Sequence, residues 1–276
     1  MEPSLTPGSV WALWHAMRDK GPLVQCITNL VSMDLMANTL LAAGASPAMA
    51  HALDEVEDFV GIADALLINI SNLSSDWNAA KKLAAQKAVA LGKPWVLDPV
   101  GCGATPYRTQ MCLALLQLRP TVVRGNASEI LALAGAAGSA VRGVDSTAES
   151  HEALDAAKAL ARRCSCIVAV SGATDLVTDG TRVAGVSNGV PLLTRVTATG
   201  CSLTALIAAF LAVAPKGGEL EATAAALAVF GLAGETSLAA APRPGPGSLR
   251  VGLLDALHIM GEAEVLAGVR VRVMEG

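Results

Sequence analysis

A run of small residues gives way abruptly to a long apolar helical pattern in the segment TATGCSL, residues 197–203. Where a helix begins in this way, several backbone N–H groups lie at the positive end of the helix dipole and can bind phosphate. The same field favours the thiolate form of Cys201 in the first turn. The segment predicts a phosphate site with a polarised thiol, and the alternative is an ordinary helix start with a buried, inert cysteine.

A carboxylate and a glycine-rich loop follow a strand-like run at residues 94–97. Asp98 ends that run and precedes the loop 101–104, so it could bind metal-held water or a phosphate group. An Asp-Pro turn explains the segment equally well. Pro106 occupies the third-glycine position of a dinucleotide fingerprint, which disfavours a Rossmann site.

A second carboxylate follows the apolar run 121–123. Asn126 and Glu129 are three residues apart and face the same side as a helix begins. Glu129 could hold Mg²⁺ through water, and Arg124 could bind a phosphate group. The Asn-x-x-Glu spacing is also a good helix-capping pattern, so capping alone is the alternative.

Three shorter signals are open to two interpretations. Ser171 directly follows the apolar run 166–170 and begins a turn of small residues that permits close approach of a nucleotide phosphate. An ordinary β-turn explains this segment equally well. Met49 follows Ser-Pro, where its backbone could meet a small ring, and core packing is the alternative. Asn29 lies in an apolar segment and could simply tie loops together.

Composition excludes several classes of protein. The 276 residues are 53% hydrophobic and 16% charged with a net charge of −4, and no basic cluster suggests a nucleic-acid partner. No uncharged apolar run is long enough to span a membrane. The six cysteines fit no zinc module. We expect a cytoplasmic protein that forms one domain over residues 1–276, with apolar surface buried in its core and between subunits.

Apolar runs bounded by turn residues alternate with helical periodicity, which predicts an α/β fold with a mainly parallel central sheet and helices on both faces. Ligands gather beyond the carboxyl ends of strands in such sheets, where the polar residues above lie. The expected strands are 24–28, 46–50, 65–70, 95–100, 121–124, 167–171, 175–179 and 182–187. The expected helices are 8–20, 31–43, 77–91, 106–117, 128–137, 149–163, 200–213, 219–233 and 248–263.

Taken together, these segments resemble the hydroxyethylthiazole kinase family of thiamin salvage, which has the ribokinase-like fold. The resemblance covers nearly the whole chain, with the family's motifs in the family's order. They are ITN at 27–29, GASPAM at 44–49, DPVG at 98–101, RGNASE at 124–129, TGC at 199–201 and GPGS at 245–248. No single motif is specific, but the set is.

The resemblance implies Mg²⁺-dependent transfer of the γ-phosphate of ATP to the primary alcohol of 4-methyl-5-(2-hydroxyethyl)thiazole. It also implies a homotrimer with the thiazole site between subunits. By matching positions, Met49 and Gly200 contact the thiazole, Arg124 and Ser171 contact ATP, Asp98 and Glu129 organise Mg²⁺, and Cys201 stands where relatives in the wider superfamily have an aspartate base.

The sequence departs from the family pattern at Ala198, where glycine is usual. We therefore expect an alanine in a backbone conformation of positive φ, which costs energy. Ser171 replaces the more familiar threonine and keeps the hydroxyl. The alternative functions are a kinase of the same fold that acts on hydroxymethylpyrimidine or pyridoxal, and a non-catalytic protein that binds thiazole or nucleotide.

Overall fold

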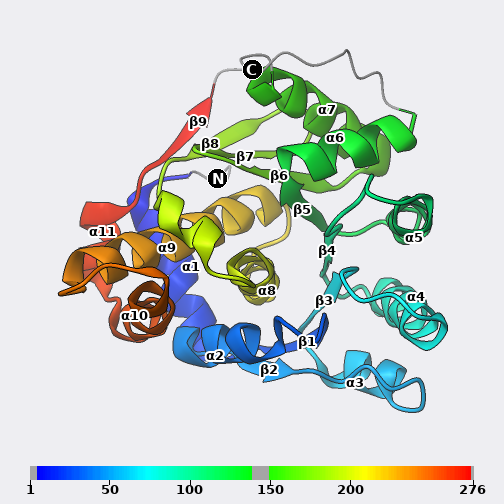
Figure 1. Ribbon diagram of the computed structural model, residues 1–276, viewed down its shortest axis with the longest axis horizontal. Coiled ribbons are helices and arrows are strands. Elements are labelled where there is room, and N and C mark those ends of the chain that lie inside the picture. The colour runs from blue at the N-terminus through cyan, green and yellow to red at the C-terminus, as the bar shows by residue number, and fades with distance from the viewer. Residues whose placement is uncertain (1–4, 139–148, 275–276) are drawn as a thin grey trace.

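The computed structural model describes residues 5–138 and 149–274. Its centre is a nine-stranded sheet in the order β2-β1-β3-β4-β5-β6-β7-β8-β9 (Figure 1). The strands are β1 (Leu23–Ile27), β2 (Ser46–Ala48), β3 (Ala65–Asn69), β4 (Trp95–Asp98), β5 (Val122–Asn126), β6 (Ile167–Ser171), β7 (Asp175–Thr178), β8 (Val183–Val186) and β9 (Val271–Met274).

The strands from β2 to β6 are paired in parallel, whereas β7, β8 and β9 are antiparallel. The register brings polar residues level with one another at the carboxyl ends. Asn69 of β3 lies opposite Asp98 of β4, and Asn126 of β5 lies opposite Ser171 of β6. The predicted α/β fold with a mainly parallel sheet is confirmed.

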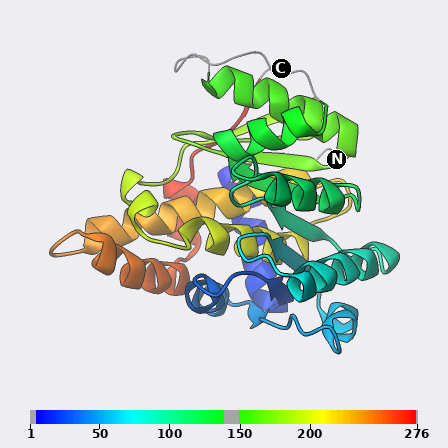
Figure 2. The ribbon, with the colours of Figure 1, turned by 45° about the vertical axis from the view of Figure 1, so that its right-hand side comes forward.

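Helices cover both faces of the sheet (Figures 1 and 2). One face carries α3 (Val56–Ile62), α4 (Ser75–Ala90), α5 (Pro106–Leu116), α6 (Ala127–Ala136) and α7 (Glu149–Cys164). The other carries α1 (Pro7–Lys20), α2 (Met33–Ala43), α8 (Thr199–Leu211), α9 (Glu219–Ala240), α10 (Pro246–Ile259) and α11 (Glu262–Gly268). The 3-10 helix η1 (Pro191–Arg195) precedes α8.

Local sequence explains where many of these helices begin and end. Ser74 and Thr105 each accept a backbone N–H of the first helical turn through the side-chain hydroxyl, which satisfies a donor that the helix cannot pair itself. Gly44 ends α2 with φ 94°, a conformation that glycine adopts without steric cost. The expected start of α5 and end of α2 agree with the structure, whereas α4 begins at Ser75, two residues before its expected start.

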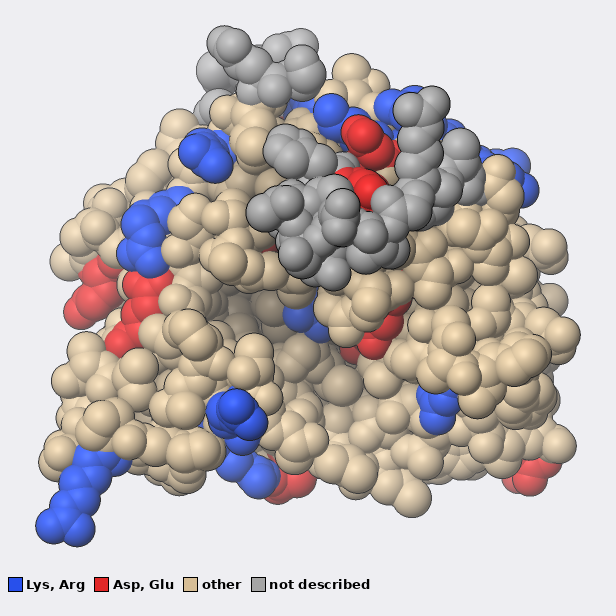
Figure 3. Space-filling model, turned by 45° about the horizontal axis from the view of Figure 1, so that its top comes forward, with Lys and Arg blue, Asp and Glu red and all other residues tan. Residues whose placement is uncertain are grey.

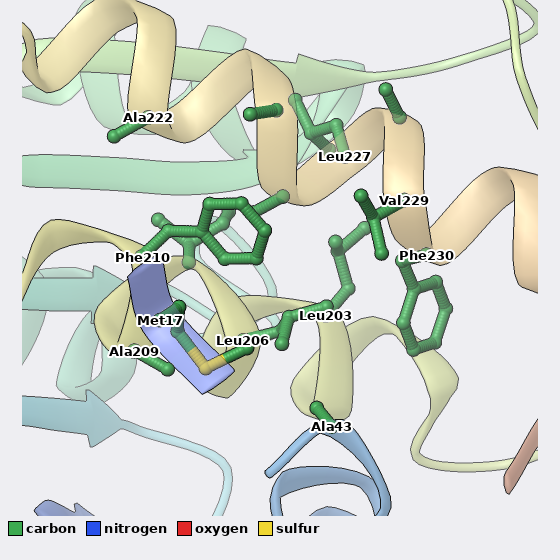
Figure 4. Close-up of a cluster of buried hydrophobic side chains, with 14 of the residues drawn as sticks. Met17, Ala43, Leu203, Leu206, Ala209, Phe210, Ala222, Leu227, Val229 and Phe230 are labelled. Carbon is green, nitrogen blue, oxygen red and sulfur yellow. The ribbon is translucent and has the colours of Figure 1, made fainter. Parts of the chain in front are cut away.

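The core on the α8 side of the sheet contains the helix pair α8 and α9. Phe210, Leu206 and Met17 pack beneath α9, as Figure 4 shows. By length and composition α9 alone among the described helices could cross a membrane, but 78% of its most apolar window is buried inside the protein. Its apolar character is therefore accounted for by packing within the core.

Many element ends lie one or two residues from those expected, and η1 was not predicted. Four further differences are larger. α9 continues to Ala240, beyond the predicted end at residue 233, because Gly231 and Gly234 do not interrupt a helix that tertiary contacts support. The predicted helix 248–263 is two helices, α10 and α11, separated at Met260 and Gly261. The short helix α3 and the edge strand β9 were not predicted. β9 pairs with β8, which lies about 85 residues earlier, so no local signal marks it.

Candidate active site

The carboxyl ends of β4, β5 and β6 and the first turn of α8 enclose a cavity of about 710 Å³. Six of the seven predicted site residues line it, namely Asp98, Arg124, Glu129, Ser171, Gly200 and Cys201. The rest of the lining is largely apolar and includes Val190 and Leu193 around η1 and Leu227 and Phe230 of α9. Figure 3 shows a hollow in one face of the molecule, with basic and acidic side-chain atoms in it or at its margin.

The amino terminus of α8 opens into this cavity without a capping side chain. Ala198 is the N-cap residue, with φ 68° and ψ 0°, and makes no side-chain hydrogen bond. The expected positive φ at this alanine is thus confirmed. The hydroxyl of Thr199 donates to the carbonyl groups of Leu193 and Val196, at 3.0 Å each, and braces the turn instead of capping it. The first N–H groups of α8 remain available to an anion.

Arg124 crosses from β5 to this helix terminus. Its Nη2 donates to Oγ of Ser171 at 2.6 Å. A Cβ atom on Gly200 would lie 2.9 Å from Nη1 of Arg124, closer than real Cβ contacts, so glycine is what lets the guanidinium sit against the first turn of α8. The buried Nε–H of Arg124 has no hydrogen-bond partner within the described part of the chain. The positive charge of Arg124 and the dipole of α8 therefore both favour an anion at the amino terminus of α8.

Asp98 is 1% exposed and is held through one oxygen. Nδ2 of Asn69 donates to Oδ2 at 2.8 Å, and the hydroxyl of Thr204 lies 3.2 Å from the same oxygen. Oδ1 accepts no hydrogen bond from any described residue, and Asp98 lines the cavity. Burial raises the pKa of Asp98 to about 6, with nearby Arg124 acting in the opposite direction.

Glu129 forms the helix cap that was the alternative considered for it, and its role toward Mg²⁺ stays a prediction. Its Oε2 accepts the backbone N–H of Asn126 at 2.9 Å, while Oδ1 of Asn126 accepts the N–H of Glu129, which completes a capping box on α6. Its Oε1 accepts the N–H of Gly101 at 3.0 Å and so ties the glycine-rich loop after β4 to α6. The half-buried side chain also lines the cavity.

Cys201 lies in the first turn of α8, but its thiol is not activated in the way the sequence suggested. Burial, and secondly the neighbouring Asp98 carboxylate, raise the pKa of the Cys201 thiol to about 12. The prediction of a lowered thiol pKa is wrong because the field of the helix terminus is outweighed by loss of water and by a like charge. Cys201 is a thiol at neutral pH in this geometry.

Three buried residues complete the site beyond the predicted set: Asn29, Asn69 and Thr204. Nδ2 of Asn69 lies 3.3 Å from Sγ of Cys201, and Nδ2 of Asn29 lies 3.8 Å from it. Asn29 also ties its own loop, as expected, through the N–H groups of Val31 and Ser32. Asn69 is the last residue of the fully buried strand β3, and a polar residue at the end of an apolar run is the signal that could have found it.

Met49 does not line the cavity. It follows β2, the edge strand next to β1, and is half-buried against the core. Its carbonyl oxygen lies 3.0 Å from Nδ1 of His51. Met49 therefore lies at the carboxyl ends of the strands, as the other site residues do, but away from the cavity of its own chain. Its contact with a thiazole stays a prediction.

The arrangement brings together an uncapped helix terminus, Arg124 and the carboxylates of Asp98 and Glu129, and Asp175 also lines the cavity. Positive charge at the phosphates and carboxylates that can hold a metal ion are what phosphoryl transfer uses. Residues 14–262 match the sequence model of the Hydroxyethylthiazole kinase family. The chain belongs to the hydroxyethylthiazole kinase family. The resemblance stated from the motifs is thereby confirmed, and the alternative functions are not favoured.

Named relatives agree with this membership. The chain is 55% identical over 264 residues to a hydroxyethylthiazole kinase of Zea mays, which covers 95% of this chain and 92% of that protein. It is 52% identical to one of Arabidopsis thaliana, over 95% of this chain and 94% of the relative. Kinase activity follows from these likenesses over almost the full length.

Solved structures extend the comparison to the fold. The hydroxyethylthiazole kinase protein of Pyrococcus horikoshii OT3 has a TM-score of 0.89 at 42% identity and covers 96% of this chain and 99% of its own. A pyridoxal kinase of Staphylococcus aureus has a TM-score of 0.63 at 16% identity, over 92% of this chain and 98% of its own. That second likeness shows the shared ribokinase-like fold and no more.

Proposed function

We propose that this protein transfers the γ-phosphoryl group of ATP to the primary hydroxyl of 4-methyl-5-(2-hydroxyethyl)thiazole, and that residues 1–276 form one catalytic domain. The observation that carries the proposal is the meeting of Arg124 with the uncapped first turn of α8 at Gly200, inside a cavity that Asp98 and Glu129 also line. Its family membership supplies the substrate class.

The triphosphate would lie against the N–H groups of residues 199–201, with Arg124 and Ser171 at its side. These donors are fixed before substrate arrives, so they stabilise the charge of the transferring group without reorganising. The apolar wall that includes Val190, Leu227 and Phe230 suits the flat base of the nucleotide. The thiazole alcohol would attack in line from the side of Cys201.

The donor set fits Mg²⁺. The described residues contain no group of three side chains that could cage a metal alone, but Mg²⁺ usually keeps several waters and is held by one or two carboxylates together with substrate phosphates. Asp98 has a free oxygen, and Glu129 lies in the same cavity. These two residues would hold the ion through water, and the ion would neutralise charge on the phosphate oxygens.

The hydroxyl proton has little need of a strong base, because the transition state of phosphoryl transfer is loose and bond formation to the nucleophile is late. The Cys201 thiol, with its raised pKa, therefore serves first to position the alcohol. Cys201 could still act as a base, but not an obligatory one, because only a very small fraction of the thiol is ionised at neutral pH.

We also propose a cytoplasmic homotrimer with the thiazole bound between subunits. Two exposed apolar side chains, Leu30 and Val31, directly follow Asn29 at the edge of the sheet where the cavity opens, with exposed fractions of 70% and 67%. Such side chains next to a site are typical of a subunit contact. Met49, which lies apart from the cavity of its own chain, would then contact thiazole bound at a neighbouring subunit.

A coupled assay of ADP release with hydroxyethylthiazole, with and without Mg²⁺, tests the proposal. We expect ADP release only when hydroxyethylthiazole and Mg²⁺ are both present. We expect little or none when hydroxymethylpyrimidine or pyridoxal replaces the thiazole. Calorimetry on the same samples separates binding from chemistry. Thiazole binding without ADP release would contradict the proposed activity, and faster turnover of either other alcohol would contradict the proposed substrate.

A further inference from the structure

The amide of Asn69 joins the two groups that face the reacting atoms in the proposed function. Its Nδ2 lies 2.8 Å from Oδ2 of Asp98 and 3.3 Å from Sγ of Cys201. One amide nitrogen carries two hydrogens, so both contacts form at once. No other described residue hydrogen-bonds to both of these side chains.

The orientation of this amide is fixed by its remaining partners. Oδ1 of Asn69 accepts the backbone N–H of Ser71 at 2.9 Å and Nδ2–H of Asn29 at 3.2 Å. Rotating the amide by 180° would turn an oxygen toward the Asp98 carboxylate and a nitrogen toward the Ser71 N–H, which are both repulsive. All four hydrogen-bonding positions of the fully buried side chain are filled.

The consequence for Asp98 is a fixed rotation of its carboxylate. Asn69 and Thr204 both hold Oδ2, which leaves Oδ1 for the cavity. The consequence for Cys201 is a fixed direction of its sulfur, since Asn69 and Asn29 approach the same atom. Three strand ends, of β1, β3 and β4, are thus connected to the first turn of α8 through one amide.

We propose that Asn69 is a positioning residue for phosphoryl transfer, which sets the cation-facing oxygen of Asp98 and the alcohol-facing sulfur of Cys201 in register. This inference rests on the proposed function of the cavity. Asn69 itself is not among the residues that line the cavity. Because displacement of reacting groups by about 1 Å can cost about 100-fold in rate, the effect belongs to kcat and not to substrate affinity.

The main test is Asn69→Asp, which keeps the shape of the side chain and sets a carboxylate against Asp98. We expect kcat to fall about 100-fold while KM for ATP and for the thiazole changes by less than about threefold. Asn78→Asp is the matched control, because that amide pairs with the hydroxyl of Tyr107 outside the cavity. The control should keep wild-type kcat. An Asn69→Asp protein with wild-type kcat, or with raised KM alone, would overturn the inference.

A second variant protects the test against misfolding and against failure of the proposed function. The exchange N69D/D98N restores an amide–carboxylate hydrogen bond in reversed order. We expect the gain in melting temperature of N69D/D98N over Asn69→Asp to exceed the gain of Asp98→Asn over the wild type, because only the first gain includes a restored pair. We expect kcat to stay low because the carboxylate has moved to β3. This comparison needs no substrate, so it stays informative if the thiazole is not the acceptor. Two equal gains would overturn the pairing.

Discussion

The surroundings of Cys201 raise the pKa of its thiol, although its position in the first turn of a helix would be expected to lower it. A thiol in a first helical turn is usually acidified, yet burial and Asp98 raise its pKa to about 12. Its sulfur instead lies among the amides of Asn29 and Asn69 and close to the Arg124 charge. These groups would also stabilise a carboxylate in the same place.

Cys201→Asp should therefore keep or raise kcat, because a carboxylate accepts a proton at neutral pH and the surrounding donors can hold it. Steady-state ADP release, with ATP binding measured by calorimetry, checks this. Cys201→Ala is the companion variant and should reduce kcat without abolishing it. A Cys201→Asp protein that folds, binds ATP and fails to turn over would show that this position does not handle the proton.

Ionised Asp98 costs the folded protein stability. Its pKa is about 6 in the folded protein against an ordinary value of 3.8, so ionisation is harder when the chain is folded. The destabilisation is absent below about pH 4, develops as pH rises through 4 to 6, and is complete above 6. Asp98→Asn should then raise the free energy of unfolding at pH 7.5 by about 1–3 kcal/mol.

Asp98→Asn should also abolish Mg²⁺-dependent turnover. In the wild type, kcat/KM should fall as pH drops through about 6, because the ionised Asp98 carboxylate is the form expected to be active. Denaturant unfolding and a pH–rate profile measure the two effects. Glu129→Gln should also lose turnover but should not gain stability, because Glu129 caps α6 and holds the Gly101 loop. Full activity in Asp98→Asn would contradict the metal role.

At the scale of elements, the start of α8 depends on a strained alanine and a required glycine. Ala198 adopts φ 68°, which costs a residue with a Cβ atom about 1–2 kcal/mol. Ala198→Gly should relieve that strain and so stabilise the fold. The greater freedom of glycine in the unfolded chain reduces this gain by about 0.5–1 kcal/mol. We expect a net gain of roughly 0.5–1 kcal/mol and unchanged or higher kcat.

Ala79→Gly, in the interior of α4, is the control for this substitution. Its helical backbone suits alanine, so it should lose about 1 kcal/mol in the same unfolding measurement. A loss of stability in Ala198→Gly comparable to that of the control would show that no strain is stored at the start of α8.

Gly200→Ala tests the contact between α8 and β5. The new Cβ atom would lie 2.9 Å from Nη1 of Arg124, so the guanidinium must move away from the helix terminus. We expect KM for ATP to rise about tenfold as a charged contact to phosphate is weakened. Gly247→Ala, where a Cβ atom meets nothing within 4 Å, should leave KM unchanged. An unaltered KM for ATP in Gly200→Ala would show that the contact of Arg124 with the helix terminus does not contribute to ATP binding.

At the scale of the molecule, the proposed trimer should have a native mass about three times the 28.0 kDa of one chain. Sedimentation equilibrium measures this directly. Val31→Glu places a charge among the exposed apolar side chains beside Asn29, and should shift the mass toward one chain and raise KM for the thiazole. Val273→Glu, on the exposed edge strand β9, is the control. A monomeric wild-type protein with full activity would contradict a thiazole site between subunits.

The family resemblance implied the glycine-type backbone at Ala198. The parallel α/β sheet and the strand ends that carry Asp98, Arg124 and Ser171 could be predicted from the amino-acid sequence alone. These features follow from hydrophobic periodicity, turn residues and short motifs, which act over a few residues. The motifs in their order also identified the family.

The interactions between those residues became visible only in the folded structure. The thiol pKa of Cys201 depends on Asp98, which lies more than 100 residues earlier in the chain, and the amide of Asn69 gains its role by standing opposite Asp98 in the sheet. The edge strand β9 likewise depends on β8. Desolvation and long-range pairing arise when distant segments pack together, so a local pattern carries no record of them.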